Sequence, residues 1–186
     1  MLVSDGPSPI DLVPTGGTWG GLLFDNPQTG RPLSLTWGFT IEYEEVERDH
    51  GATTPSLTAD WISFDRPTWR EMTGNRVQGV EFGDALEASA YFFEHHRYDT
   101  VDLAIIDQRE TELRVAIEVT GDVDGLGLDV IKAEEWLQFS GIVVAPSRKP
   151  RSARAARRLL GRFVDTAGLI AEDRGRGYAF SPDTRR

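Results

Sequence analysis

Residues 101–120 read VDLAIIDQRETELRVAIEVT, and they carry the clearest structural signal in the chain. Apolar and polar side chains alternate over residues 112–120, which is the period of a strand with one buried face. Residues 101–107 form a second strand-like segment, and Gln108 to Thr111 supply a turn between the two. The stretch therefore predicts an antiparallel β-hairpin at the centre of the chain.

Further strands are expected on both sides of this hairpin. From Thr36 to Val46, the apolar residues Trp37, Phe39, Ile41 and Tyr43 alternate with Gly and polar residues, which is typical of a half-buried antiparallel strand. Other short apolar segments predict strands at residues 18–24, 57–64, 77–82, 141–145 and 177–180. The sequence thus predicts a β-rich, antiparallel N-terminal half.

Helices are expected in fewer places. Residues 152–164 carry an apolar stripe at helical spacing and predict an amphipathic C-terminal helix. Residues 84–96 begin with a capping-box spacing, Asp84 to Glu87, and favour a helix, although a strand also fits. Residues 129–139 leave the same choice open. We therefore expect an α+β fold in which the C-terminal helix packs on the sheet.

The chain has 186 residues, the length of one domain. Residues 1–17 are rich in Pro, Gly and Ser and predict an irregular lead-in, and residues 18–186 a single compact domain. The absence of cysteine excludes disulfides, thiol catalysis and cysteine-rich zinc sites. No apolar run reaches membrane-spanning length, and the N-terminus has no signal-peptide pattern. We expect a cytoplasmic protein that does not bind membranes.

Charge is unevenly distributed along the sequence. Residues 1–147 hold 9 Lys and Arg against 26 Asp and Glu, whereas residues 148–186 hold 11 against 4. An acidic body favours basic partners, and a basic tail can fold back on that body. The expected contact patch for a basic protein partner is Glu42, Glu44, Glu45, Glu47 and Asp49.

The C-terminal helix also carries a basic stripe. Arg151, Arg154, Arg158 and Arg162 are spaced three or four residues apart and so share one helix face. Such a stripe could bind phosphates of a nucleic acid, but at this spacing it is more often a solvated or acid-docked face.

An enzymatic alternative comes from the central hairpin. Asp102 lies early in one strand and Glu118 in the next, an arrangement that resembles the PD-(D/E)xK nuclease-like superfamily over residues 84–146. The resemblance implies that these carboxylates bind a divalent metal, with Glu87 or Glu94 as a further ligand. Thr120 stands where the motif has lysine, and Lys132 is the residue that could replace it.

Two weaker patterns complete the candidate sites. Asp122, Asp124 and Asp129 lie in a Gly-rich loop and could bind a metal ion, although the spacing departs from an EF-hand. The five tryptophans would suit either a core or a pocket for a small apolar ligand.

The function that the sequence favours is a non-enzymatic acidic interaction module, of inhibitor, immunity or regulatory type. The alternatives are a metal-dependent nuclease-like protein and a carrier of a small apolar ligand.

Overall fold

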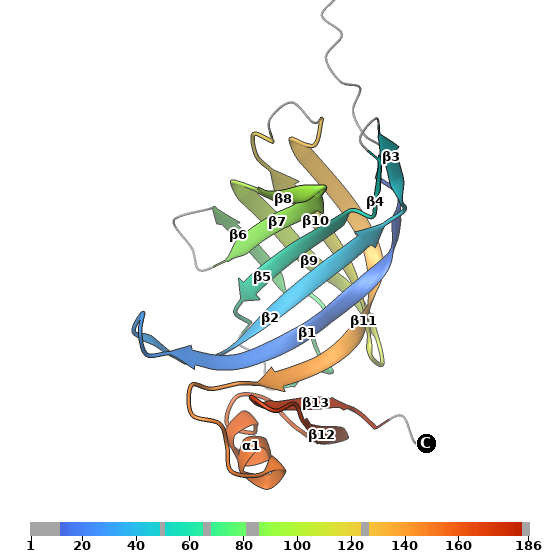
Figure 1. The fold of residues 1–186 in the computed structure, drawn as a ribbon. Coiled ribbons are helices and arrows are strands. Elements are labelled where there is room, and N and C mark those ends of the chain that lie inside the picture. Colours follow the sequence, from blue (N-terminus) through green and yellow to red (C-terminus); the bar gives the residue numbers. More distant parts are fainter. Residues whose placement is uncertain (1–11, 49–50, 65–67, 81–85, 124–126, 184–186) are drawn as a thin grey trace, which may run out of the picture.

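The computed structural model describes residues 12–48, 51–64, 68–80, 86–123 and 127–183, which form a mostly β structure with a short helix near the C-terminus (Figure 1). In chain order the elements are β1 (Pro14–Asn26), β2 (Arg31–Tyr43), β3 (Val46–Arg48), β4 (Gly51–Thr53), β5 (Ser56–Ile62), β6 (Arg76–Val80), β7 (Glu87–Phe92), β8 (Glu94–Arg97), β9 (Thr100–Arg109), β10 (Glu112–Thr120), β11 (Val130–Val144), α1 (Ala153–Leu160), β12 (Leu169–Asp173) and β13 (Tyr178–Pro182).

A single large sheet contains most of these strands. Its order is β6-β9-β10-β11-β1-β2-β5-β7-β8, and β13 joins it by pairing with β11 and β12. β1 and β11 run parallel, whereas the other neighbours in the sheet are antiparallel. β3 and β4 form a separate small hairpin. The sheet is therefore mixed, not purely antiparallel.

The sheet curls around its own apolar face. β1 and β2 run along one wall and β9 and β10 along the other, so that the apolar faces of both walls contribute to one core (Figure 1). The alternation expected from the sequence sets this face. Trp37, Phe39, Ile41 and Tyr43 of β2 are all buried, and so are the alternate apolar residues of β10, namely Leu113, Val115, Ile117 and Val119. The predicted central hairpin is confirmed as β9 and β10.

The expected α+β class is wrong. Residues 87–92 and 94–97 are the strands β7 and β8, and residues 130–144 form the long strand β11, so the described part of neither ambiguous segment is helical. Asp84, the expected capping residue, lies outside the described residues. Ala88, Ala90 and Phe92 are buried at every second position, and β7 pairs with β5. The intrinsic helix preference of alanine and glutamate is therefore overridden by burial of one strand face.

The helix at the C-terminus exists, but it is short. α1 covers residues 153–160, with Ser152 as its N-cap, and only Ala156 and Leu160 of its residues are buried. It lies beside β12 at one end of the molecule and does not cover the face of the sheet (Figure 1). The amphipathic stripe predicted a helix correctly and its packing partner incorrectly.

Glycine is required where β11 changes partner. Gly141 has φ of +106°, and a Cβ atom there would lie 2.5 Å from the carbonyl oxygen of Phe180 in β13. The neighbouring residues 142–144 pair with β13. A side chain at position 141 would therefore both strain the backbone and push β13 away.

Replacement of Gly141 by alanine should destabilise the protein by at least about 2 kcal/mol, from strain and the clash with β13. The matched control is Gly30→Ala, which also has a positive φ (+73°) but meets no atom within 4 Å. It should cost about 1 kcal/mol. Urea denaturation of both variants measures the difference, and equal losses would show that contact with β13 contributes nothing.

Candidate functional site

The predicted catalytic residues come together on the outer face of the sheet. Glu118 of β10 pairs directly with Asp102 of β9 on one side and with Lys132 of β11 on the other. Because paired residues of neighbouring strands point to the same face, their side chains form one row across three strands. The sequence left open whether Asp102 and Glu118 share a face, and the structure places them on one face together with Lys132 of β11.

Cations of the chain occupy both carboxylates of this row. Arg76 donates through Nε to Asp102 Oδ1 at 2.8 Å and through a second nitrogen to Oδ2, and Gln78 adds a bond of 2.7 Å. Lys132 Nζ lies 3.0 Å from Glu118 Oε1. The hydrogen bond from Arg76 holds the pKa of Asp102 below its usual range. The row is thus internally compensated.

The further metal ligands expected from the resemblance lie elsewhere. Glu87 and Glu94 belong to β7 and β8, at the opposite edge of the strand order from β9, and Glu87 pairs with Arg97 at 2.8 Å. Thr120, at the position of the motif lysine, shares a hydroxyl hydrogen bond of 2.5 Å with Thr100. Asp102, Glu118 and Lys132 are therefore brought together without Glu87 or Glu94, and the carboxylate of Glu134, which lies on the same face, pairs with Arg114.

Substituting Asp102 by asparagine should lower the free energy of unfolding at pH 7 by up to about 1 kcal/mol, because an exposed bidentate ion pair is lost. The pKa of this carboxyl is lowered in the folded state. Its stabilising effect is complete above the unfolded value of about 3.9 and is lost as the pH falls through the folded value. The gap between wild type and variant should therefore close in acid.

Unfolding measured between pH 7 and pH 3 checks this expectation. Asp99→Asn serves as the control, since Asp99 is exposed and its carboxylate has no hydrogen bond or ion pair within the described residues. A gap that stays constant with pH would mean that the charge of Asp102 is not what stabilises the fold.

The loop that contains Asp122 and Asp129, expected as a metal site, is held together by hydrogen bonds between its own residues. The Asp129 carboxylate accepts a hydrogen bond of 3.2 Å from the Val123 amide, and Asp129 O accepts one of 2.9 Å from the Gly121 amide. Asp122 lies in this loop, and Asp124 falls outside the described residues. Over the part of the chain that the structure describes, no three His, Asp or Glu side chains are grouped as a metal site requires.

The acidic patch lies at the end of β2 and continues into β3. We call Glu42, Glu44, Glu45 and Glu47 the acidic cluster; Asp49, also expected there, is outside the described residues. All four side chains are exposed and make no ion pair or hydrogen bond with any described residue. Their backbone is fixed, because Tyr43 is buried and the Glu44 amide donates to Val13 O at 2.9 Å. The cluster therefore presents uncompensated charge on a rigid support.

The arginine stripe lies on α1 and on the residues that flank it. Arg151, Arg154, Arg158 and Arg162 are exposed, and within the described chain none forms an ion pair. Arg157, not singled out from the sequence, turns inward and donates to Thr166 O at 2.9 Å and to Leu169 O at 2.6 Å. Figure 1 places α1 and the β3–β4 hairpin at opposite ends of the molecule. The basic tail folds back through β13, but these arginines do not dock on the acidic body.

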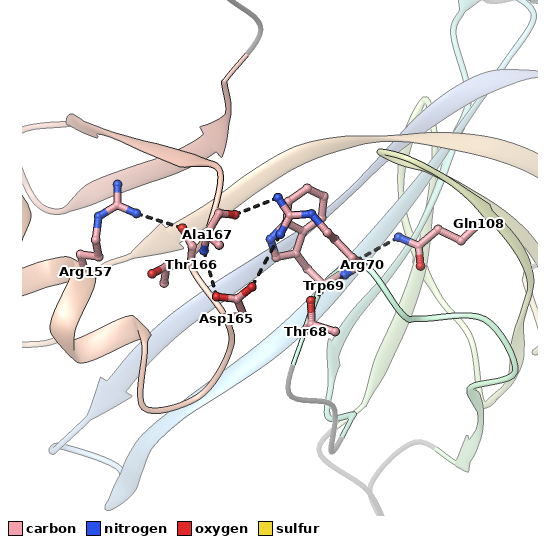
Figure 2. Close-up of polar contacts among 8 residues, drawn as sticks. All are labelled: Thr68, Trp69, Arg70, Gln108, Arg157, Asp165, Thr166 and Ala167. Atoms are coloured by element: carbon pink, nitrogen blue, oxygen red, sulfur yellow. Dashed lines mark hydrogen bonds and ion pairs between the residues drawn. The ribbon is translucent and has the colours of Figure 1, made fainter. Parts of the chain in front are cut away.

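Sequence reasoning missed a cleft of about 1010 Å³ between residues 69–73 and the C-terminal residues 168 and 182–183. Trp69 is buried there and stacks on Phe139, with ring centres 4.6 Å apart. The guanidinium of Arg70 lies 4.1 Å from the centre of the Trp69 ring and donates to Ala167 O at 2.8 Å (Figure 2). Arg70 therefore connects the body of the sheet to the segment that follows α1.

Gln108 of β9 holds residues 69–72 in place by hydrogen bonds to their backbone. Its amide nitrogen donates to Trp69 O at 3.0 Å, and its amide oxygen accepts from the Met72 backbone at 2.8 Å. In Figure 2, Gln108 contacts Trp69 on one side, and Arg70 extends to the other side, towards Asp165 and Ala167. No sequence motif marks these groups, because their hydrogen bonds join residues 36 to 97 positions apart in the chain.

Replacing Arg70 by alanine should destabilise the protein by about 1–3 kcal/mol, since a hydrogen bond, an aromatic contact and packing are lost together. Arg158→Ala is the matched control, because Arg158 is exposed and makes no ion pair with a described residue. It should change stability by less than about 0.5 kcal/mol. Equal stabilities of both variants in urea would contradict the role assigned to Arg70.

The tryptophans fill the core more than they line a pocket. Trp37, Trp19, Phe139 and Trp69 form a continuous series of ring contacts, with centres 5.7, 4.4 and 4.6 Å apart. Trp61 and Trp136 are half-buried, each beneath an arginine guanidinium, at 4.7 Å from Arg31 and 4.3 Å from Arg109. These contacts explain the tryptophans without a bound ligand.

Comparisons of the chain with protein-family models, with curated proteins and with solved structures give no match. In the described residues, no helix has the length and apolar character needed to cross a membrane.

Proposed function

We propose that this protein is a non-enzymatic interaction module that binds a basic protein partner through the acidic cluster. The observation that carries the proposal is the contrast between two sets of carboxylates. Asp102 and Glu118 each form an ion pair with a cation of the chain, whereas Glu42, Glu44, Glu45 and Glu47 form none with any described residue. Uncompensated charge on a fixed backbone is available to a partner without the cost of breaking internal ion pairs.

The charge of the whole chain supports the same function. The net charge is −10, and the acidic residues are concentrated before residue 148. A field of this sign accelerates encounter with basic proteins and repels nucleic acid. Because the arginine stripe lies at the far end from the cluster, it does not screen the cluster from a partner.

Removing the cluster should weaken binding to a defined basic probe, a Lys- and Arg-rich peptide, at physiological salt. A variant with Glu42, Glu44, Glu45 and Glu47 changed to Gln should lose about tenfold or more in affinity, or roughly 1.4 kcal/mol over four charges. The control carries the same loss of charge at exposed positions outside the cluster: Glu71→Gln, Glu94→Gln, Asp99→Asn and Glu112→Gln. It should lose less than about threefold.

Isothermal titration calorimetry of the two variants with the peptide measures whether the loss of affinity depends on the position of the charges. Since both have the same net charge, a difference between them reports position and not overall charge. Equal losses would reduce the effect to non-specific attraction and would overturn the cluster as a binding site.

The PD-(D/E)xK-type nuclease is kept as a second candidate because Asp102, Glu118 and Lys132 lie in one row. In that function the carboxylates bind a divalent metal and the lysine assists the attacking water. The arginine stripe, expected to hold phosphates, belongs to the region of α1 and not to β9, β10 or β11. The compensation by Arg76 and Lys132 favours the binding function over this one.

Incubation of plasmid and single-stranded DNA with the pure protein, in Mg²⁺, Mn²⁺ or EDTA, separates the two candidates. If the protein is a binding module, wild type and Asp102→Ala should show the same background with and without metal. Metal-dependent cleavage that disappears in Asp102→Ala would establish the nuclease and locate its metal site.

A further inference from the structure

A small hollow lies on the outer face of the sheet, over β11, β1, β2 and β5. Its volume is about 280 Å³, room for roughly nine water molecules at their liquid volume. Gly20 of β1 and Gly38 of β2 pair with each other and form its floor. Ser140 of β11 lies at one side and Asp60 of β5 at the other.

The two floor glycines are needed for space. Neither Gly20 nor Gly38 has a positive φ, so the backbone there does not itself require glycine. A Cβ on Gly20 would lie 2.5 Å from Ser140 Oγ, and one on Gly38 would lie 2.5 Å from Asp60 Oδ1. The missing side chains therefore let the hydroxyl and the carboxylate lie across neighbouring strands and face the same hollow.

A strained residue holds Asp60 in this position. Trp61, the next residue along β5, has φ of +64°, a rare conformation for a bulky side chain. It coincides with an irregularity in the pairing of β2 and β5 between Trp37 and Phe39. Such strain costs about 1–3 kcal/mol, and irregular strand positions of this kind are common beside binding sites, where they redirect a side chain. Trp61 also lines the hollow.

Two hydroxyl groups of the hollow, those of Ser140 and Thr36, can only accept hydrogen bonds from a ligand. Ser140 Oγ donates its proton to Trp19 O at 2.9 Å, and Thr36 Oγ1 donates to Leu22 O at 3.4 Å. The lone pairs of both oxygens stay available. The Asp60 carboxylate, when ionised, is also an acceptor. A ligand that satisfies these groups must bring several donors.

Asp60 is also the sole ionisable residue among the described residues that line the hollow. Its carboxylate has no hydrogen bond or ion pair within the described chain. Its cross-strand neighbour is Glu87, a second carboxylate, which pairs with Arg97. Loss of hydration in the hollow and the charge of Glu87 raise the pKa of Asp60. The site thus carries negative charge that lacks a counter-ion.

We propose that the hollow binds the ammonium group of a lysine side chain, presented by the basic partner, with Asp60 as counter-ion and Ser140 and Thr36 as hydrogen-bond acceptors. An ammonium supplies three donors and one positive charge. Glu42 shares the outer face of β2 with Gly38, four residues or about 13 Å away, so one basic segment can reach both the acidic cluster and the hollow. The partner is that of the proposed function, on which this inference rests.

The test uses two probes on the full-length protein, followed by the amide NMR signals of Gly20 and Gly38. The first probe is N-acetyl-lysine methylamide, whose single ammonium needs only the hollow. It should shift both glycine signals in wild type and in the variant that lacks the acidic cluster. Its Nζ-acetylated form, which is uncharged, should shift neither signal.

Asp60→Asn keeps the shape of the side chain and removes its charge, and it should abolish the shifts. It should also lower the affinity for the Lys- and Arg-rich peptide threefold or more, whereas Asp99→Asn should leave that affinity unchanged. The variant should fold, because it removes a charge that has no partner in the described chain. Thermal unfolding confirms this before the titrations.

The outcomes separate this inference from the proposed function. Shifts that persist in Asp60→Asn, or that appear equally with the acetylated probe, would overturn the lysine site. If the cluster variant loses peptide affinity while Asp60→Asn binds as wild type does, the interaction module stands and the hollow does not. If the small probe shifts the signals of Gly20 and Gly38 but the cluster variant binds the peptide as its charge-matched control does, the hollow is a lysine site and the acidic cluster is not a binding site.

Discussion

The pairing of β11 with three other strands is the constraint on which the structure depends. Residues 130–138 of β11 pair with β10, and residues 142–144 pair with β13 along that same edge, while β1 occupies the opposite edge. On this edge, β11 changes its partner from β10 to β13 near Gly141. Because buried backbone groups must find partners, a strand used in this way fixes the positions of all its neighbours. In the strand order of the sheet, the two walls meet where β11 pairs with β1.

The curvature of the sheet also determines where ionisable side chains lie. With the apolar residues enclosed by the sheet, ionisable residues gather on its outer face and at its ends. Arg76 of β6 pairs with Asp102 of β9, and Lys132 of β11 pairs with Glu118 of β10, so the two adjacent carboxylates and their cations form a compensated row. At the end of β2 the glutamates of the acidic cluster form no ion pair with any described residue, although Arg48 follows Glu47 in β3. The same residue type thus forms structural ion pairs in one place and, in the proposed function, binds a partner in the other.

Local patterns predicted the strands well, because alternation over β2 and β10 reports directly which residues face the core. The sequence left open whether Asp102 and Glu118 share a face, because an irregularity between Arg114 and Val115 shifts by one residue the register that the turn sets. β11 was ambiguous because Lys132 to Leu137 suits a helix as well as a strand. Its strand state depends on pairing with β10 over residues 130–138, while β1, more than 100 residues earlier in the chain, pairs with β11 only from Gln138 on. The class of the fold was wrong for this reason.

The sites that sequence reasoning missed depend on register between distant strands. Gly20 and Gly38 read as ordinary strand glycines until their pairing puts them under Asp60 and Ser140. The left-handed Trp61 beside a carboxylate without a counter-ion lowers stability, and a chain selected for stability alone would relieve both. The chain has no cysteine, so no disulfide offsets such losses. Strain and unpaired charge retained together at one hollow therefore argue that the hollow is kept for binding and not for folding.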